Sequence, residues 1–407
     1  MTRTSIQPTL RRAVSAEDGT ALPIALIVLV ILTSLSIVFT SLATTEPVLS
    51  RNHSIAAQAR GYAESAIERA LWALNNPTNA KGLADPLPNP VTSPDESVRY
   101  DGSQFVSVSP NGGFTVAATG TGNERTITAV GWAPDTTGQL RAAKKIRATL
   151  ARLGWTNANP NCALCIKGVL DLGGNAEINA LGNYCAGSTP LSGSLSTGNT
   201  PAPTGSAEVY GPGDTEPNGS ADILKNRPDS EVNYSLTTDD LELLRAIAQA
   251  NGTYYRGAVE FNSSNRLPDA GGVVFVDTTT GADLTTTPSM TPTSQMGNVT
   301  ITGNQTWSGW LIAMGDITIS GTVSLTGSIY ARNDFVFSGN GTITGTVTAE
   351  NMLGTTQSSV DSVAAELGGS ARIAYHCQAA KTGGGTVQAG WTLKPGSYLE
   401  VDGISGT

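Results

Sequence analysis

The chain has 407 residues and a formal net charge of −9, with 24 Lys and Arg against 33 Asp and Glu. The negative balance argues against a nucleic-acid-binding protein, which needs a basic surface to displace counterions, and two histidines leave little for metal or acid–base chemistry. Only 14% of residues are charged, while 46 are glycine and threonine is more frequent still. This composition disfavours a disordered acidic chain or a helical bundle and favours turn-rich β-structure.

The first predicted element is a membrane span over 21–43. It lies in an uncharged segment, Thr20–Thr45, whose centre is the apolar run Ile24–Leu32. About 20 helical residues, each rising about 1.5 Å, cross a hydrocarbon core of about 30 Å. Three arginines precede the run, so the positive-inside rule places the amino terminus in the cytoplasm and the rest outside. A plain single-span anchor and a cleaved signal peptide are the alternatives.

A helical period continues after the apolar run ends. We expect Pro47 to kink this helix without ending it, and Asn75-Asn76-Pro77 to end it. The pattern therefore predicts one helix over 20–75, half in the membrane and half packed under a soluble domain. The apolar residues of the second half recur every three or four positions: Ile55, Ala59, Tyr62, Ala63, Ala66, Ile67, Ala70, Leu71 and Leu74.

This helix, together with Glu17-Asp18-Gly19 in front of it, resembles that of a type IV pilin, most closely of the PilX-type minor pilins. The resemblance implies a prepilin leader over 1–19, cut between Gly19 and Thr20. Pilins usually carry Phe at the first mature position and Glu at the fifth, where this chain has Thr20 and Ile24. The missing carboxylate fits a subunit with no neighbour above it, at or near the filament tip.

The same resemblance implies a location and partners. The protein would be a single-pass inner-membrane protein with a periplasmic carboxyl terminus, later moved into an extracellular pilus. Its partners would be other minor pilins, the major pilin, the prepilin peptidase and a large tip adhesin. No nucleic acid and no cofactor are implied.

The sequence of 80–155 predicts a small antiparallel sheet that covers the second half of the helix. It contains no catalytic pattern. Short runs rich in β-branched residues alternate with Gly- and Pro-containing turns. The predicted strands are Phe105–Val108, Phe114–Thr119, Thr126–Val130 and Lys145–Leu153.

An 18-residue repeat organises 297–353. Gly297–Gly303 aligns with Gly315–Gly321, which aligns with Asn333–Gly339. Apolar residues alternate with Thr or Ser, and Gly marks the corners, so each unit fits one turn of a parallel β-solenoid with turns about 4.8 Å apart. The predicted class is therefore α+β, with a pilin-like helix and sheet followed by a mainly-β domain. A Thr-rich antiparallel sandwich is the alternative.

The segments around the repeat are assigned from the same pattern. Residues 160–185 share its register and predict a first turn, followed by an insertion at 186–296. Within the insertion we expect a helix, Asp239–Ala250, that Thr237 caps, and a buried strand, Gly272–Asp277.

The last segment, 354–407, is predicted to cap the open end of the solenoid, since a final turn leaves backbone groups unpaired. We expect a short helix over Val360–Leu367 and a closing strand over Arg372–Cys377. The solenoid resembles the bactofilin-like β-helices attached to some PilX-type proteins, which have no catalytic motif.

The four cysteines predict disulfides, because the topology places them outside the cytoplasm. A zinc site that includes His376 and a redox-active Cys-x-x-Cys pair are the alternatives. Four cysteines allow three connectivities, and we expect Cys377 to tie the closing strand to 162–185. The cysteines are Cys162, Cys165, Cys185 and Cys377.

One corner of the repeat carries Asn298, Asp316 and Asp334 in successive units. Stacked carboxylates there could bind Ca²⁺ through Asp316 and Asp334, or act as the acid and base of a polysaccharide enzyme, but Asn and Asp are also ordinary turn residues. His53 and Asp171 are interpreted as solvated surface residues. We expect a structural subunit without enzymatic activity; the alternative is a membrane-anchored extracellular β-helix enzyme or binding module acting on polysaccharide.

Overall fold

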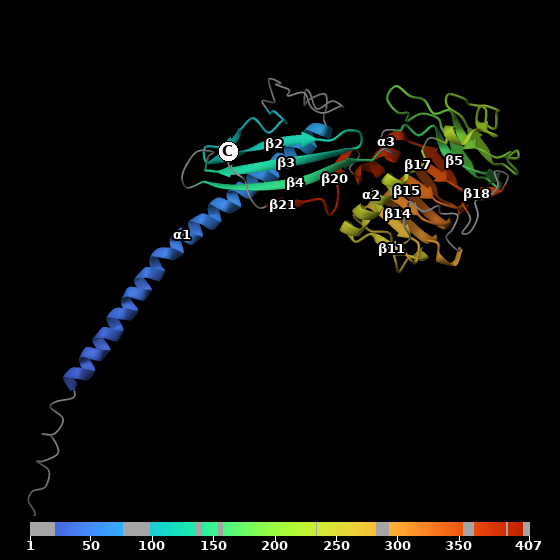
Figure 1. The fold of residues 1–407 in the computed structure, drawn as a ribbon. Coiled ribbons are helices and arrows are strands. Elements are labelled where there is room, and N and C mark those ends of the chain that lie inside the picture. Colours follow the sequence, from blue (N-terminus) through green and yellow to red (C-terminus); the bar gives the residue numbers. More distant parts are fainter. Residues whose placement is uncertain are drawn as a thin grey trace, which may run out of the picture.

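The fold is α+β, as predicted: a long helix, an antiparallel sheet and a larger parallel β domain follow one another (Figure 1). The predicted leader and the Gly19–Thr20 cleavage site lie outside the described residues. The computed structural model describes residues 21–75, 98–134, 141–153, 158–232, 234–281, 293–352, 362–387 and 390–401.

Helix α1 (Ala21–Asn75) is continuous over 55 residues and passes through Pro47, which makes it about 80 Å long. Figure 1 shows a bare amino-terminal half and a carboxyl-terminal half that lies along the sheet. We call the bare part, 21–48, the stem. From Ala59 onward the helix packs through small side chains, because a helix lined with Ala can approach a sheet closely. The smallest of its buried residues are Ala59, Ala63, Ala66, Ala70 and Ala73.

The sheet that covers α1, which we call the head, has six strands among the described residues. Four antiparallel strands follow the predicted order along the chain: β1 (Val106–Ser109), β2 (Gly112–Thr119), β3 (Glu124–Ala133) and β4 (Ala142–Arg152). The other two, β20 (Trp391–Leu393) and β21 (Leu399–Val401), both pair with β4 and come from the carboxyl-terminal segment. That segment was expected to cap the solenoid, so its place in the head is a correction.

The larger domain is a parallel β-solenoid with the predicted 18-residue period. β14 (Val299–Ala313) and β15 (Ile317–Ala331) pair residue for residue, from Val299 opposite Ile317 to Ala313 opposite Ala331. The next turn of the solenoid, or rung, is divided between β16 (Phe335–Gly339) and β17 (Thr342–Ala349). The parallel register rules out the antiparallel sandwich.

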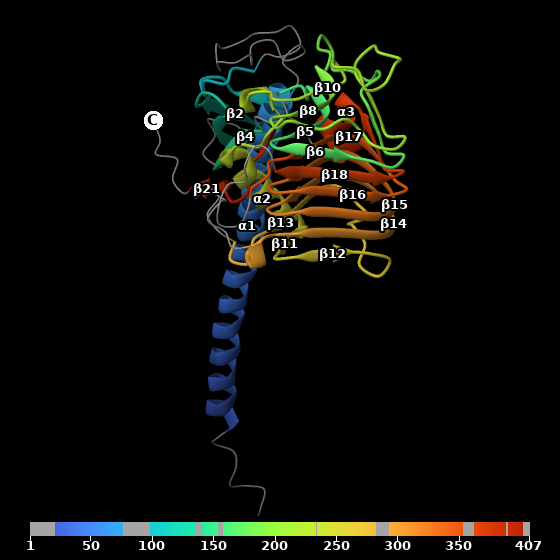
Figure 2. The same ribbon diagram turned by 90° about the vertical axis from the view of Figure 1, so that its right-hand side faces the viewer.

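The strands form three stacks, one on each side of the solenoid. The first joins β12 (Val259–Phe261), β14, β15, β16, β18 (Val363–Gly369) and β6 (Val169–Leu172), seen in this order in Figure 2. The second joins the middle parts of β14 and β15 to the first half of β17, then to β19 (Arg372–Tyr375), β7 (Glu177–Asn179) and β9 (Glu208–Tyr210). The third joins β11 (Tyr254–Arg256), β13 (Gly272–Asp277), β14, β15, β17, β5 (Cys162–Ile166), β8 (Ser192–Ser196) and β10 (Ile223–Leu224).

The rungs do not stack in chain order. In the rung at 162–179, β5 pairs with β17, β6 with β18 and β7 with β19, and strands of 192–224 lie beyond this rung. The chain then crosses to the opposite end, where β11 to β13 precede β14. The segment 186–296 is therefore part of the solenoid at both ends, and the helix expected at Val360–Leu367 is wrong, because the described residues there form strand β18.

Two helices cover the third stack. Helix α2 (Thr238–Asn251) begins at a capping box between Thr237 and Asp240 and ends at Gly252, whose φ of 71° is left-handed. Helix α3 (Cys377–Thr382) follows β19. Both contribute to a core with β13, β14 and β15. Single 3₁₀ turns lie at η2 (Asp229–Glu231), η4 (Thr293–Gln295) and η5 (Gly383–Gly385).

Candidate functional site: the apolar stem and its junction with the head

The stem exposes a continuous apolar surface. Leu22 is 75% exposed, Ile37 70% and Phe39 65%, and the most apolar 18-residue stretch has a mean hydropathy of 2.8 with none of it buried. Among the described residues, α1 is the one helix long and apolar enough to cross a membrane. A patch of this size on an isolated soluble protein marks a membrane or protein contact.

Four hydroxyl side chains of the stem are satisfied within the helix. The hydroxyls of Thr33 and Ser34 donate to carbonyl oxygens one turn earlier, Leu29 O at 2.8 Å and Val30 O at 2.7 Å. Ser36 and Thr40 do the same. Since a polar group left unpaired in hydrocarbon costs several kcal/mol, this pattern suits a helix surrounded by lipid or by other apolar side chains.

The helix meets the head at a very close approach. A Cβ on Gly131 of β3 would collide with the carbonyl oxygen of Ala59 and lie 2.6 Å from the backbone nitrogen of Ala63. Only glycine fits here, because α1 lies directly on the strand. The contact continues through Ile127 and Ile146, both fully buried against the Ala stripe. The second half of α1 and the head therefore share one packed core.

The carboxyl-terminal strand fastens the end of the helix. The side chain of Asn75 donates to the carbonyl oxygen of Trp391 at 2.9 Å and accepts from the Trp391 backbone N–H at 2.7 Å. Trp391 is buried in the head core, with the guanidinium of Arg125 over its ring at 5.0 Å. The Asn75 amide thus pairs with the backbone N–H and carbonyl of Trp391 as an adjacent strand would.

A polar seam runs beside this contact on the surface of α1. Tyr398 donates to Glu64 at 2.9 Å, and Glu64 also pairs with Arg60 at 3.0 Å. Burial is the largest cause that raises the pKa of the Tyr398 phenol. Glu400 accepts from Lys144 at 2.6 Å, and this hydrogen bond lowers the pKa of the Glu400 carboxyl. The seam orders β21 along the helix.

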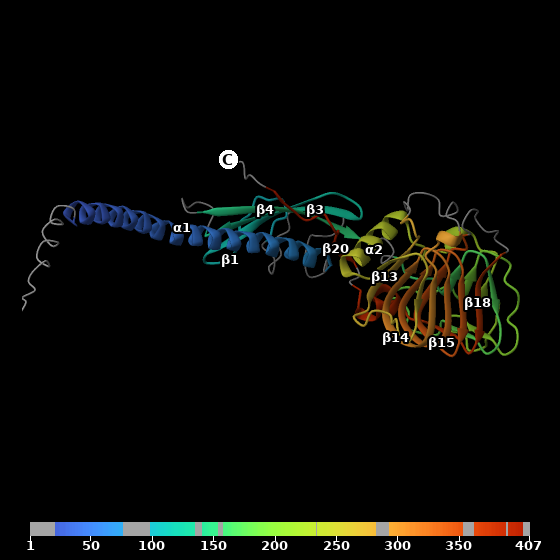
Figure 3. The same cartoon turned by 90° about the horizontal axis from the view of Figure 1, so that it is seen from below.

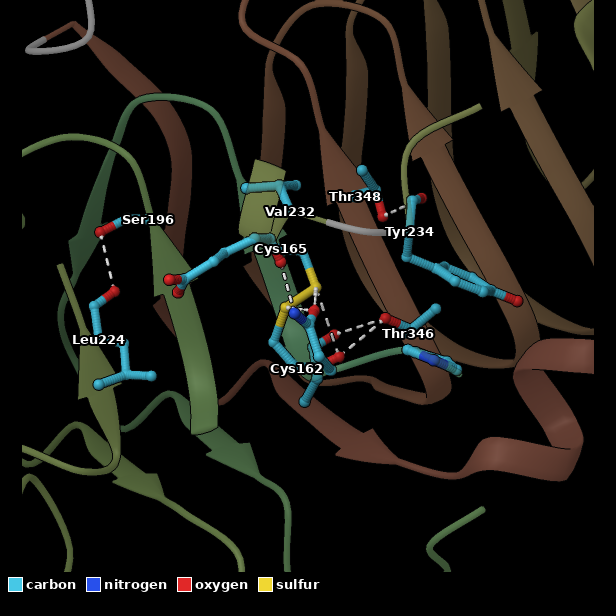
Figure 4. Close-up of a disulfide and its surroundings, with 12 residues drawn as sticks. Cys162, Cys165, Ser196, Leu224, Val232, Tyr234, Thr346 and Thr348 are labelled. Atoms are coloured by element: carbon cyan, nitrogen blue, oxygen red, sulfur yellow. Dashed lines mark hydrogen bonds between the residues drawn. A yellow bond between two sulfur atoms is a disulfide. The ribbon is translucent and has the colours of Figure 1, made fainter. Parts of the chain in front are cut away.

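All four cysteines form disulfides within the solenoid, Cys162–Cys165 and Cys185–Cys377. Figure 4 shows the first beside Thr346, whose hydroxyl donates to the carbonyl oxygen of Cys162 at 3.0 Å. The second joins the loop after β7 to the start of α3.

The residues considered for a metal site serve the backbone instead. His376 caps α3, its Nδ1 accepting from the Ala379 N–H at 3.1 Å. The cysteines carry no thiolate, since they are paired, and within the described ranges no three His, Cys, Asp or Glu side chains gather around one point. His53 and Asp171 are exposed.

The Asn298–Asp316–Asp334 corner is a ladder between rungs. The Asp316 backbone N–H donates to Asn298 Oδ1 at 2.9 Å, and the Asp334 N–H donates to Asp316 Oδ1 at 3.3 Å. Asn333 Nδ2 also donates to Asp316 Oδ1, at 2.6 Å. Burial, and then the charges of Asp316 and Glu366, raise the pKa of the Asp334 carboxyl to about 7. The Asn298 and Asp316 side chains thus bond successive backbones together, the role of turn residues.

Sequence patterns found the stem but missed the residues that hold the head together. Asn75 and Trp391 are 316 positions apart, and neither belongs to a periodic pattern. A lone asparagine at a helix end indicates only where the helix stops, so the sequence held no signal for this contact.

Among known proteins, the similarity found lies at the level of structure. No known protein family and no curated protein matches the chain. The crystal structure of the competence-associated pilin ComZ from Thermus thermophilus aligns over 85% of this chain and 97% of that chain, with 14% sequence identity and a TM-score of 0.20. At this TM-score the alignment carries no functional argument for this chain.

Proposed function

We propose that the chain is a structural, pilin-like subunit of a type IV pilus. The observation that carries this proposal is the single helix α1, whose first half is a bare apolar stem and whose second half is fixed to an antiparallel sheet. A stem of this kind can hold the protein in a membrane and later pack among the stems of other subunits, with no change in the head.

The arrangement of the three parts supports a place at or near the filament tip. Figure 3 shows the head between the stem and the solenoid, so the solenoid lies at the end of the molecule farthest from the membrane-spanning part. In a filament, a domain of this size would project from the surface and would be accommodated most easily where no subunit follows. Adhesion through the solenoid is part of the proposal.

The proposed life cycle begins as a single-pass inner-membrane prepilin with a periplasmic carboxyl terminus. Prepilin peptidase cuts between Gly19 and Thr20, and the mature chain joins other minor pilins and the major pilin, with a large tip adhesin as a further partner. The disulfides fit this route, because such bonds persist in oxidising compartments.

Amino-terminal sequencing tests processing and class together. The full chain is expressed in a piliated host that has prepilin peptidase and in the same host without it, and sheared filaments are collected. We expect the filament-associated protein to begin at Thr20, and the Gly19→Ala variant to stay at precursor size in the membrane. A chain that begins at Met1, or after residue 45, and never enters filaments would overturn the proposal.

A further inference from the structure

A polar groove of about 370 Å³ lies at the corner between the first and second stacks of the solenoid. One wall is the corner of β14 and β15, and the other is the loop that leaves β12, visible beyond that strand in Figure 2. The corner contributes Asn304, Thr306, Thr322 and Ser324, and the loop contributes Arg266 and Asp269. Neither the stem nor the head forms any part of it.

Both walls of the groove are held in place before any ligand arrives. On the solenoid side, Asn304 lies opposite Thr322 and Thr306 opposite Ser324, in continuous parallel pairing. Their spacing is fixed by the rungs at about 4.8 Å. The side chains of these four residues are exposed, so they are free to present hydroxyl and amide groups to a ligand at a regular distance.

The loop wall is pinned by buried side chains of β14. Gln305, 4% exposed, donates through Nε2 to the carbonyl oxygen of Asn262 at 2.7 Å. The indole of Trp307 donates to the carbonyl oxygen of Pro268 at 3.1 Å. Asn265 Nδ2 closes the loop on itself by donating to Glu260 O at 2.6 Å. A preorganised wall lowers the ordering cost of binding.

The groove has an apolar floor and a polar rim that carries hydrogen-bond donors, hydrogen-bond acceptors and both signs of charge. Leu267 and Val323, each 3% exposed, form the floor. The rim offers groups that donate, groups that accept, and hydroxyls that do both. Arg266 and Asp269 bring opposite charges that cancel, and Arg266 forms no ion pair with any described residue. Such a rim suits a neutral ligand with many hydroxyl groups better than an ion.

We propose that this groove binds a neutral saccharide of one or two sugar rings. A sugar ring has an apolar C–H face for Leu267 and Val323 and a hydroxyl edge for the rim, and the volume falls in the range of about 300–1,000 Å³ of ligand pockets. Asp269 is the one carboxylate among the lining residues, whereas glycoside hydrolysis requires a pair. The groove therefore binds without cleaving. This inference does not depend on the pilus role.

The test measures binding of neutral sugars to the full chain in an amine-oxide detergent, which has no sugar headgroup to compete. Saturation-transfer NMR is run with a panel of neutral monosaccharides and disaccharides, and with a uronic acid and inorganic phosphate as charged probes. At least one neutral sugar is expected to bind, and the charged probes are not. Asp269→Asn should weaken the affinity about tenfold and Thr322→Val about fivefold.

The matched control is Thr318→Val on the same strand, which lies in the first stack outside the groove and should bind as the wild type does. Both groove substitutions are at exposed side chains, and an unchanged thermal midpoint will show that each variant is folded. Three results would overturn the proposal: no neutral sugar binding at millimolar concentration, a charged probe bound in its place, or equal affinities for Thr318→Val and both groove variants.

Discussion

Gly131 is the residue on which the helix–sheet contact depends most directly. Because a Cβ there would meet the backbone of α1 at Ala59 and Ala63, Gly131→Ala must push the helix away from β3. We expect a loss of about 1–3 kcal/mol of head stability, the usual cost of overpacking. Gly61→Ala is the control: nothing lies within 4 Å of its Cβ, so better helix propensity should stabilise α1 by about 1 kcal/mol. Thermal unfolding, followed by Trp fluorescence, gives the midpoints of the two variants. Equal midpoints would contradict the close approach of α1 to β3.

Asp334 makes the solenoid corner sensitive to pH. Its folded-state pKa of about 7 lies above the value of about 3.9 expected in the unfolded chain, so the folded state holds this proton more tightly. Its contribution to stability is therefore present below about pH 4 and is lost as the pH rises through 7. The Asp334→Asn variant, which mimics the protonated form, should unfold at a higher temperature than the wild type at pH 8.

At pH 5 the difference in unfolding temperature between the wild type and Asp334→Asn should be smaller than at pH 8. The exposed Asp171→Asn serves as a control, with the same change in net charge two rungs away in the first stack. Differential scanning calorimetry at both pH values gives the comparison. If Asp334→Asn raises the unfolding temperature no more at pH 8 than at pH 5, the raised pKa assigned to Asp334 is wrong.

Strand β20 is the element that closes the head, and Asn75 is its attachment. Asn75→Ala removes both hydrogen bonds to Trp391, which should lower the local stability of β20 by about 1–3 kcal/mol. Hydrogen exchange at the Trp391 amide should then become faster by a factor of about ten or more. Glu68→Ala, an exposed change on the same helix, should leave that rate unchanged. Equal protection in both variants would mean that β4 alone holds β20.

The two disulfides differ in how much of the chain they constrain. Cys162–Cys165 closes a separation of 3 residues and Cys185–Cys377 one of 192. In the chain-entropy account, these correspond to about 2 and about 5 kcal/mol. Paired Ala substitutions should therefore lower the denaturation midpoint of the solenoid much more for the second bond. A larger effect from the Cys162–Cys165 pair would contradict this ranking.

The elements that sequence analysis predicted correctly carry a local period. The stem has an uninterrupted apolar run, and β14 and β15 repeat at 18 residues, so neighbours in space are also regular neighbours in sequence. β18 was mistaken for a helix because Val363, Ala364 and Ala365 lack the Gly and Thr of the repeat. The strands that pair with β18 on the adjacent rungs lie 30 or more residues away in the sequence.

At the scale of the whole molecule, the return of the chain could not be predicted. The path leaves the head after β4, builds both ends of the solenoid, and comes back to β4 through β20 and β21. Short edge strands of this kind have no hydrophobic period, and their pairing depends on which edge is left open by the rest of the fold. The return gives the head and the solenoid two chain connections, so force on the solenoid reaches α1 through the sheet.

The stem should therefore act as an anchor for the complete molecule, and a single charge can test it. Val30 and Val48 are exposed to similar degrees, 54% and 57%, but Val30 lies within the apolar run, whereas Val48 lies beyond the uncharged segment, after Glu46. Lysine at the centre of a membrane helix costs about 2.5–3.5 kcal/mol, and much less near an interface where it can reach water. We expect Val30→Lys to reduce both the alkali-resistant membrane fraction and the amount in sheared filaments, while Val48→Lys reduces neither. Because both variants leave the head and the solenoid untouched, equal recovery of the two in membranes and in filaments would mean that the stem neither spans lipid nor packs in a filament core.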